Sequence, residues 1–77
     1  MSIKVQYFAS LKDAIGKSED EITGEKSLSV KDVWDLSNQG HKLPENTLAA
    51  VNMDYAELND NVSDGDEVAF FPPVTGG

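Results

Sequence analysis

The sequence predicts a small α+β domain, in which a helix lies on one face of a sheet and an extended C-terminal tail follows the last strand. Apolar and polar residues alternate near both ends of the chain, as they do in half-buried strands, and an amphipathic helical pattern lies between these ends. With 77 residues, 39% of them apolar, the chain can build one hydrophobic core. We therefore expect a domain over residues 1–71 and a tail over residues 72–77.

Four segments have the patterns of strands. Residues 3–8 and 67–71 alternate apolar and polar or small side chains, residues 48–53 form a compact apolar run, and the acidic residues 19–23 suggest an edge strand. Residues 54–61 are polar and predict a connection or short turn. The apolar face of the first strand consists of Ile3, Val5 and Tyr7.

A short helix, a loop and a turn are predicted between these strands. Residues 10–16 fit a short helix that Ser10 caps and Gly16 ends. Residues 41–46 contain a proline that excludes a continuous helix and predict a loop. The Asp-Gly pair within residues 63–66 predicts the turn that leads into the last strand.

The main helix is predicted over residues 29–40. Ser29 can cap its start with Asp32 as the reciprocal partner, and Gly40 can end it. One stripe follows helical spacing and should face the sheet, with Trp34 in the core. The stripe contains Val30, Val33, Trp34 and Ser37, with Leu36 at its margin.

Composition excludes several classes of function. The formal net charge of −8, from 14 acidic and 6 basic residues, would repel a phosphate backbone, so we expect no nucleic-acid partner. The absence of cysteine excludes disulfides, thiolate metal sites and a cysteine nucleophile. No signal peptide and no apolar run near the roughly 20 residues of a membrane span are evident, so we expect a cytoplasmic protein without a membrane partner.

Side-chain sites for metals, phosphate or catalysis are not favoured. An EF-hand loop starting at Asp60 would place Val62 and Phe71 where oxygen ligands are required, so the acidic residues near the last turn indicate a solvated hairpin. These residues are Asp60, Asp64, Asp66 and Glu67. His41 has no second histidine with which to share a metal, and we interpret it as a loop residue. The terminal glycines precede no helix that could bind phosphate.

The C-terminal tail is the candidate working part of the chain. Residues 72–77 could reach about 20 Å when extended, and two prolines at their base favour a stiff, extended geometry. Gly76 and Gly77 lack side chains and could pass through a narrow channel. The Gly77 carboxylate is a poor electrophile until it attacks the α-phosphate of ATP to give an acyl-adenylate. A separate enzyme must supply the phosphate-binding site and Mg²⁺.

The activated acyl group could pass to an amine, as in protein conjugation, or to sulfur, which would give a C-terminal thiocarboxylate. Since the chain has no cysteine, any sulfur that it carries must sit on the main-chain terminus. No bound cofactor is expected for this chain itself.

The stretch DGDEVAFFPPVTGG at residues 64–77 resembles the small, sulfur-carrying subunits of molybdopterin synthase, with support from residues 48–52 and 3–9. The resemblance implies a ubiquitin-like β-grasp fold with a mixed sheet. It also implies that Gly77 is adenylated by an activating enzyme, converted to a thiocarboxylate and inserted into the large synthase subunit. There it would donate sulfur to cyclic pyranopterin monophosphate in molybdenum-cofactor biosynthesis, within a heterotetramer. The chain would then act as a non-catalytic co-substrate.

The same resemblance implies a docking surface at Phe8, Tyr55 and Phe71, although the family pattern has an aliphatic residue where this chain has Tyr55. Strand periodicity independently gives Phe8 and Phe71 the parity opposite to the expected core residues. Those core residues are Val5, Tyr7, Val68 and Phe70, and the residues expected to insert with the terminus are Pro72, Pro73, Val74, Thr75 and Gly76.

Three other functions remain open from the sequence. A ubiquitin-like modifier joined to lysines through Gly77 would need the same activated carboxylate. A sulfur carrier for thiamine synthesis and a binding module with an incidental tail are the remaining alternatives.

Overall fold

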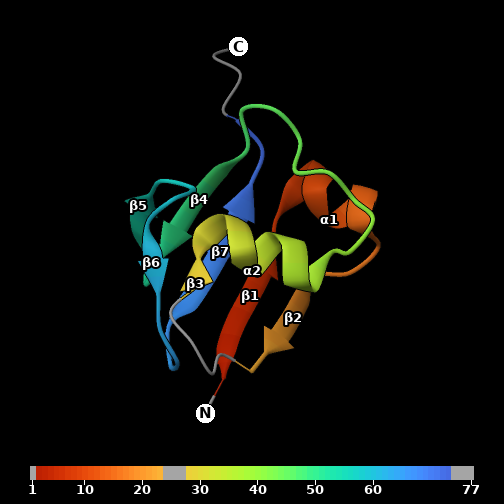
Figure 1. Cartoon of the computed structure of the whole chain (residues 1–77). Helices are drawn as coiled ribbons and strands as arrows, with labels where there is room; N and C mark the ends of the chain where they lie inside the picture. Colours follow the sequence, from red (N-terminus) through yellow and green to blue (C-terminus); the bar gives the residue numbers. More distant parts are fainter. Residues whose placement is uncertain (1, 24–27, 74–77) are drawn as a thin grey trace.

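The computed structural model describes residues 2–23 and 28–73, and within them the predicted α+β class is confirmed (Figure 1). The elements in chain order are β1 (Ile3–Tyr7), α1 (Ala9–Ile15), β2 (Glu19–Ile22), β3 (Leu28–Ser29), α2 (Val30–Ser37), β4 (Leu48–Val51), β5 (Asp54–Ala56), β6 (Asn61–Val62) and β7 (Glu67–Phe71).

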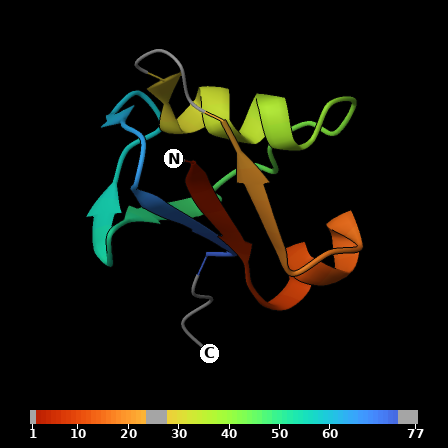
Figure 2. The same cartoon turned by 90° about the horizontal axis from the view of Figure 1, so that it is seen from below.

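Five of the strands form one mixed sheet in the order β2-β1-β7-β4-β5. The central pair, β1 and β7, is parallel, and the other neighbours are antiparallel. Helix α2 lies across one face of this sheet, as the two orthogonal views show (Figures 1 and 2). Strands β3 and β6 form a separate two-stranded ladder. The predicted arrangement of a helix on one face of a mixed sheet is therefore confirmed.

The core lies between α2 and the inward faces of β1 and β7. Burial alternates along both strands, as their sequence period predicts. Tyr7, Trp34 and Phe70 form an aromatic cluster with ring centroids 5.1 to 6.1 Å apart, and each of the three side chains is at most 2% exposed. The other buried apolar residues are Ile3, Val5, Leu11, Val30, Val33, Ala49, Val62 and Val68.

Helix α2 begins with the predicted capping box. The Ser29 hydroxyl accepts a hydrogen bond from the Asp32 backbone N–H at 3.1 Å, and the Asp32 carboxylate accepts one from the Ser29 N–H at 3.0 Å. The bond from the backbone N–H of Ser29 lowers the pKa of Asp32, with a smaller lowering from the Ser29 side chain.

The predicted end of this helix at Gly40 is wrong, because α2 ends at Ser37 with Asn38 as its C-cap. The Asn38 amide is buried and donates a hydrogen bond to the Tyr7 hydroxyl at 2.9 Å. Gly40 has a left-handed φ of 89° in the turn that follows. The helix therefore ends next to the contact that Asn38 makes with a residue distant in sequence, whereas the glycine signal predicts a later end.

Helix α1 also begins earlier than predicted. It starts at Ala9 with Phe8 as the N-cap and no side-chain cap, so the prediction that Ser10 caps it is wrong. The Phe8 N–H donates to the carbonyl of Phe70 at 3.1 Å, so the chain is still held to β7 where it turns into the helix. The predicted end at Gly16 is confirmed by its left-handed φ of 87° and by its N–H bond to Lys12.

The polar stretch 54–61 was predicted as a connection, and this is wrong in part. Residues 54–56 form β5, which pairs with β4 after a two-residue turn at Asn52 and Met53, so β4 ends at Val51 instead of residue 53. Residues 61–62 form β6, which pairs with the equally unpredicted β3. These short strands exist because neighbouring strands accept their backbone hydrogen bonds, which a local hydrophobic pattern cannot reveal. The predicted edge position of β2 is confirmed.

Neither α1 nor α2, the helices of the described segments, has the length and hydrophobicity that crossing a membrane requires.

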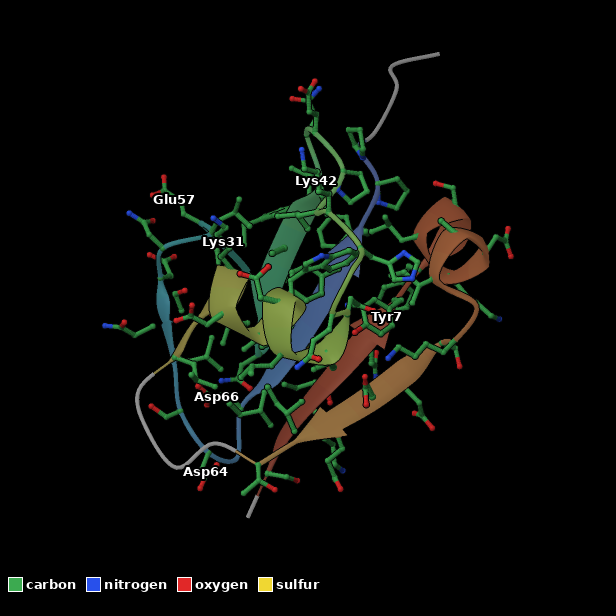
Figure 3. The ribbon with its side chains drawn as sticks, turned by 45° about the vertical axis from the view of Figure 1, so that its right-hand side comes forward. Tyr7, Lys31, Lys42, Glu57, Asp64 and Asp66 are labelled. Atoms are coloured by element: carbon green, nitrogen blue, oxygen red, sulfur yellow. The ribbon has the colours of Figure 1, made fainter. Side chains whose placement is uncertain are left out.

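We predict that Tyr7→Phe lowers the free energy of unfolding by about 1–3 kcal/mol, because it leaves the buried Asn38 amide without its partner. Tyr7 lies near the end of α2 in Figure 3. Urea denaturation followed by Trp34 fluorescence measures the change. The matched control is Tyr55→Phe, which removes a hydroxyl from a side chain that is 78% exposed. Equal stability losses in the two variants would contradict this account.

Candidate functional site

The face of the sheet turned away from α2 carries an apolar strip next to the end of β7. Directly paired residues share a face, so the outward residues of β7 align with those of β4 and β5. Phe71 pairs with Leu48, Ala69 pairs with Ala50, and Ala50 pairs in turn with Tyr55. We call this set the apolar strip: Leu48, Ala50, Tyr55, Ala69 and Phe71.

Two of the three predicted docking residues are in contact. The rings of Tyr55 and Phe71 have centroids 5.9 Å apart at an interplanar angle of 56°. Tyr55 is 78% exposed, whereas Phe71 is half-buried. Because Tyr55 comes from the outer strand β5 and Phe71 from the central strand β7, the pair spans half of the sheet.

Phe8 lies at the neighbouring strand end. It follows Tyr7, whose parallel partner is Phe70, and its N–H bonds to the Phe70 carbonyl. Its side chain is 47% exposed. Among the described side chains, no ring contact joins Phe8 to Tyr55 or Phe71. Phe8 therefore stands beside the apolar strip at the end of β1.

The other side of this face is charged. Lys4 pairs with Glu21 on β2 and with Glu67 on β7, and Gln6 pairs with Glu19. These side chains border one shallow depression across β2, β1 and β7. The face thus divides into a mostly acidic region over β1 and β2 and an apolar strip over β7, β4 and β5.

The tail begins at the apolar end of this face. Pro72 is half-buried and Pro73 is exposed, and both follow the last residue of β7 without belonging to a helix or strand. The remaining residues that we expect to insert, Val74, Thr75 and Gly76, and the reactive Gly77 lie outside the described residues. Their roles, and the division of the chain at residue 71, stay predictions.

The acidic residues near the last turn have structural partners. Asp60 accepts a hydrogen bond from the Glu57 N–H at 2.8 Å, and Asp66 accepts one from the Ser63 N–H at 2.9 Å. The Ser63 N–H and the Asn52 side chain lower the pKa of Asp66. Asp64 and Asp66 are labelled in Figure 3 at the end of the molecule opposite Lys42. These carboxylates shape turns, so the predicted turn at residues 63–66 is confirmed. The predicted hairpin is wrong, because β6 pairs with β3, whereas β7 pairs with β1 and β4.

His41 lies in the predicted loop, and its backbone carbonyl accepts a hydrogen bond from the indole N–H of Trp34 at 3.0 Å. Within residues 2–23 and 28–73, no three metal-ligating side chains gather at one point.

Sequence reasoning missed several residues of this surface. Leu48, Ala50 and Ala69 join the docking residues only through the strand register. The predicted strand over residues 48–53 includes Met53, but Met53 occupies the β4–β5 turn and is 93% exposed. The positive φ of its neighbour Asn52 has a sequence signal, since asparagine favours such turns, but this signal alone does not give the exposure of Met53.

The mixed sheet with a parallel central pair, covered on one face by α2, defines a ubiquitin-like β-grasp protein. Solved structures support this class. SAMP1 from Haloferax volcanii superposes with a TM-score of 0.79 at 25% identity over 100% of both chains. A putative molybdopterin converting factor, subunit 1, from Pyrococcus furiosus gives a TM-score of 0.74 at 28% identity, covering 96% of this chain and 99% of that one.

Residues 5–77 match the ThiS family, and the chain belongs to it. The molybdopterin synthase sulfur carrier subunit of Escherichia coli (strain K12) is 37% identical over an 84-residue alignment that covers 97% of this chain and 99% of that protein. The protein of the same name from Haemophilus influenzae is 39% identical with the same coverage.

We predict that neighbouring phenylalanines of β7 differ sharply in their effect on stability. Phe70→Ala should lower the free energy of unfolding by about 3–5 kcal/mol, because Phe70 fills the core. Phe71→Ala should cost only about 1 kcal/mol, because its side chain contacts Tyr55 on the outer face. Chemical denaturation of both variants measures the difference, and similar losses would contradict the assignment of the two faces.

Proposed function

We propose that this chain is the sulfur-carrier subunit of a molybdopterin synthase. The observation that carries the proposal is its similarity to proteins of that name, at 37% and 39% identity over nearly the full length of both partners. The family match also extends to Gly77, the residue that would carry the sulfur.

The proposed reaction takes place at the main-chain carboxylate of Gly77. Its oxygen attacks the α-phosphate of ATP, pyrophosphate leaves, and an acyl-adenylate forms. A sulfur nucleophile then displaces AMP and leaves a thiocarboxylate at the terminus. The activating enzyme binds the ATP and Mg²⁺ used in this step, and this chain supplies the acyl group.

In the second stage, the loaded tail enters the large synthase subunit and donates its sulfur to cyclic pyranopterin monophosphate. A large-subunit partner is supported by a solved complex of subunits 1 and 2 of molybdopterin-converting factor from Helicobacter pylori 26695. One chain of that complex superposes on this chain with a TM-score of 0.66 at 25% identity over 100% of both chains. The chain acts as a co-substrate of this complex, which we propose is a heterotetramer in the cytoplasm.

Docking through the apolar strip fits this role. Tyr55 and Phe71 form an aromatic surface on the outer face of the sheet, and Phe71 is the last residue before the tail. Pro72 and Pro73, which follow it, restrict the backbone at the base of the tail. A partner that covers this surface would hold the base of the tail in place while the terminus reacts. Restricting the tail base before binding also lowers the entropy lost on insertion.

A ubiquitin-like protein modifier is the second candidate. The similarity to SAMP1 favours it, since a related solved structure is named small archaeal modifier protein 1. Both functions use an activated Gly77, so only their products distinguish them. Intact-mass analysis of the native protein distinguishes a terminus in which sulfur replaces oxygen from lysine-linked conjugates.

Blocking the terminal carboxylate should abolish sulfur delivery and leave the fold unchanged. A chain that carries an amide at Gly77 has no terminal carboxylate and cannot form the adenylate, whereas a chain with Gly77 deleted ends in a Gly76 carboxylate that falls one residue short of the reacting position. The assay combines the chain with the activating enzyme, ATP, a sulfide source and the large subunit, and it measures molybdopterin. Thermal unfolding controls for folding. Sulfur delivery by the amidated chain would overturn the proposed function.

Phe71→Ala should weaken binding to the large subunit by about 1–3 kcal/mol, as is typical of an aromatic anchor at an interface. Isothermal titration calorimetry with the unloaded chain measures the affinity. The matched control is Leu36→Ala, which removes an apolar side chain that is 49% exposed on α2, the opposite side of the sheet. Unchanged binding of the Phe71 variant would remove this residue from the docking surface.

A further inference from the structure

Met53 occupies an unusual position for a methionine. It is 93% exposed, the highest value among the exposed large hydrophobic side chains of the described residues. It lies in the two-residue turn between β4 and β5. Burial in the core of this chain therefore does not account for a large apolar side chain at this point.

The backbone of the turn also disfavours methionine. Asn52 and Met53 have φ values of 52° and 73°, the positive values of a type I′ hairpin turn. Asparagine fits the first position, and glycine is strongly preferred at the second. At a left-handed φ the Cβ atom comes too close to the following carbonyl oxygen, so a residue other than glycine carries a conformational cost there. Hydrogen bonds between Asn52 and both Glu67 and Asp66 hold the first residue of the turn, whereas Met53 itself combines a left-handed φ with an almost fully exposed apolar side chain.

Met53 adjoins the apolar strip. It precedes Tyr55 by two residues, about 7 Å along an extended chain, and Tyr55 contacts Phe71. Strand β5 is the outer strand of the five-stranded sheet, and the turn before it is held to the start of β7 by hydrogen bonds between Asn52 and Glu67. A partner that covers Phe71 and Tyr55 would reach Met53 by extending about 7 Å further toward the start of β7, away from the end at which the tail begins.

We propose that Met53 is a further docking residue, which enters an apolar recess of the large synthase subunit. This inference rests on the proposed function and adds the outer edge of the sheet to the docking surface. The unbranched thioether side chain adapts to irregular apolar surfaces, which suits an anchor on a mobile or imperfectly matched rim. Strain at an exposed position is then explained by what the side chain does in the complex.

The same assignment makes docking sensitive to peroxide. The thioether sulfur of Met53 attacks one oxygen of hydrogen peroxide, the O–O bond breaks, and the sulfoxide and water form. Sulfur loses two electrons and peroxide gains them. The sulfoxide is polar, so placing it in an apolar recess opposes binding.

The chain is well suited to testing this point. Met53 is one of two methionines, the other being Met1, and there is no cysteine. The unloaded carrier is treated with dilute peroxide, the peroxide is removed with catalase, and the large subunit is then titrated. Mass spectrometry reports oxidation at each methionine. We expect the affinity to fall on the order of tenfold on oxidation.

The Met53→Leu variant separates the two methionines. Peroxide still oxidises Met1 in this variant, so its affinity before and after treatment should be the same. An equal loss of affinity in the variant would assign the effect to Met1 and overturn the role of Met53.

The Met53→Gly variant separates docking from stability. Glycine fits the left-handed turn position, so the unfolding midpoint should equal or exceed that of the native chain. Binding to the large subunit should nevertheless weaken on the order of tenfold. Native affinity in both the glycine variant and the oxidised chain would overturn the inference while leaving the proposed function intact. No binding of the native, unoxidised chain would overturn both.

Discussion

The parallel pairing of β1 with β7 is the constraint on which the rest of the structure depends. It joins the two ends of the chain at the centre of the sheet, with Val5 opposite Val68 and Tyr7 opposite Phe70. The inward aromatic residues then pack on Trp34 from α2, and these contacts bury the centre of the core. Parallel strands need a long crossover, and the connection between β1 and β7 contains every other element of the fold.

This pairing also fixes what the chain presents to a partner. Because side chains alternate along a strand, burying Phe70 under α2 requires Phe71 to face the opposite side. The same register brings Phe8 to the end of β1 beside β7. One set of strand contacts therefore stabilises the core and exposes aromatic side chains where the tail begins. A change that shifted this register by one residue would disturb stability and docking together.

The two outer strands contribute differently to that surface. Strand β2 is acidic on its outward side, where Glu19 and Glu21 pair with residues of β1. Strand β5 instead places Tyr55 against Phe71 and leads back to the strained turn at Met53. Because this face is charged on one side and apolar on the other, it is asymmetric, and a complementary partner can bind it in only one orientation.

The sequence by itself determined those features that local chemistry controls. The alternation of Ile3, Val5 and Tyr7 predicted β1, and the Ser29–Asp32 pair predicted the start of α2, because side-chain period and capping depend on residues a few positions apart. The resemblance of residues 64–77 to sulfur-carrying subunits predicted the family to which the chain belongs.

Tertiary structure alone decided the features that arise from distant residues. Asn38 at the end of α2 bonds to Tyr7, and no local signal near Gly40 reveals that contact. Strand β5 exists because β4 accepts its hydrogen bonds, and its pairing brings Tyr55 to Phe71 and leaves Met53 exposed in a left-handed turn. Hydrogen bonds and packing between segments remote in sequence favour these conformations, and their energies depend on positions that only the folded chain defines.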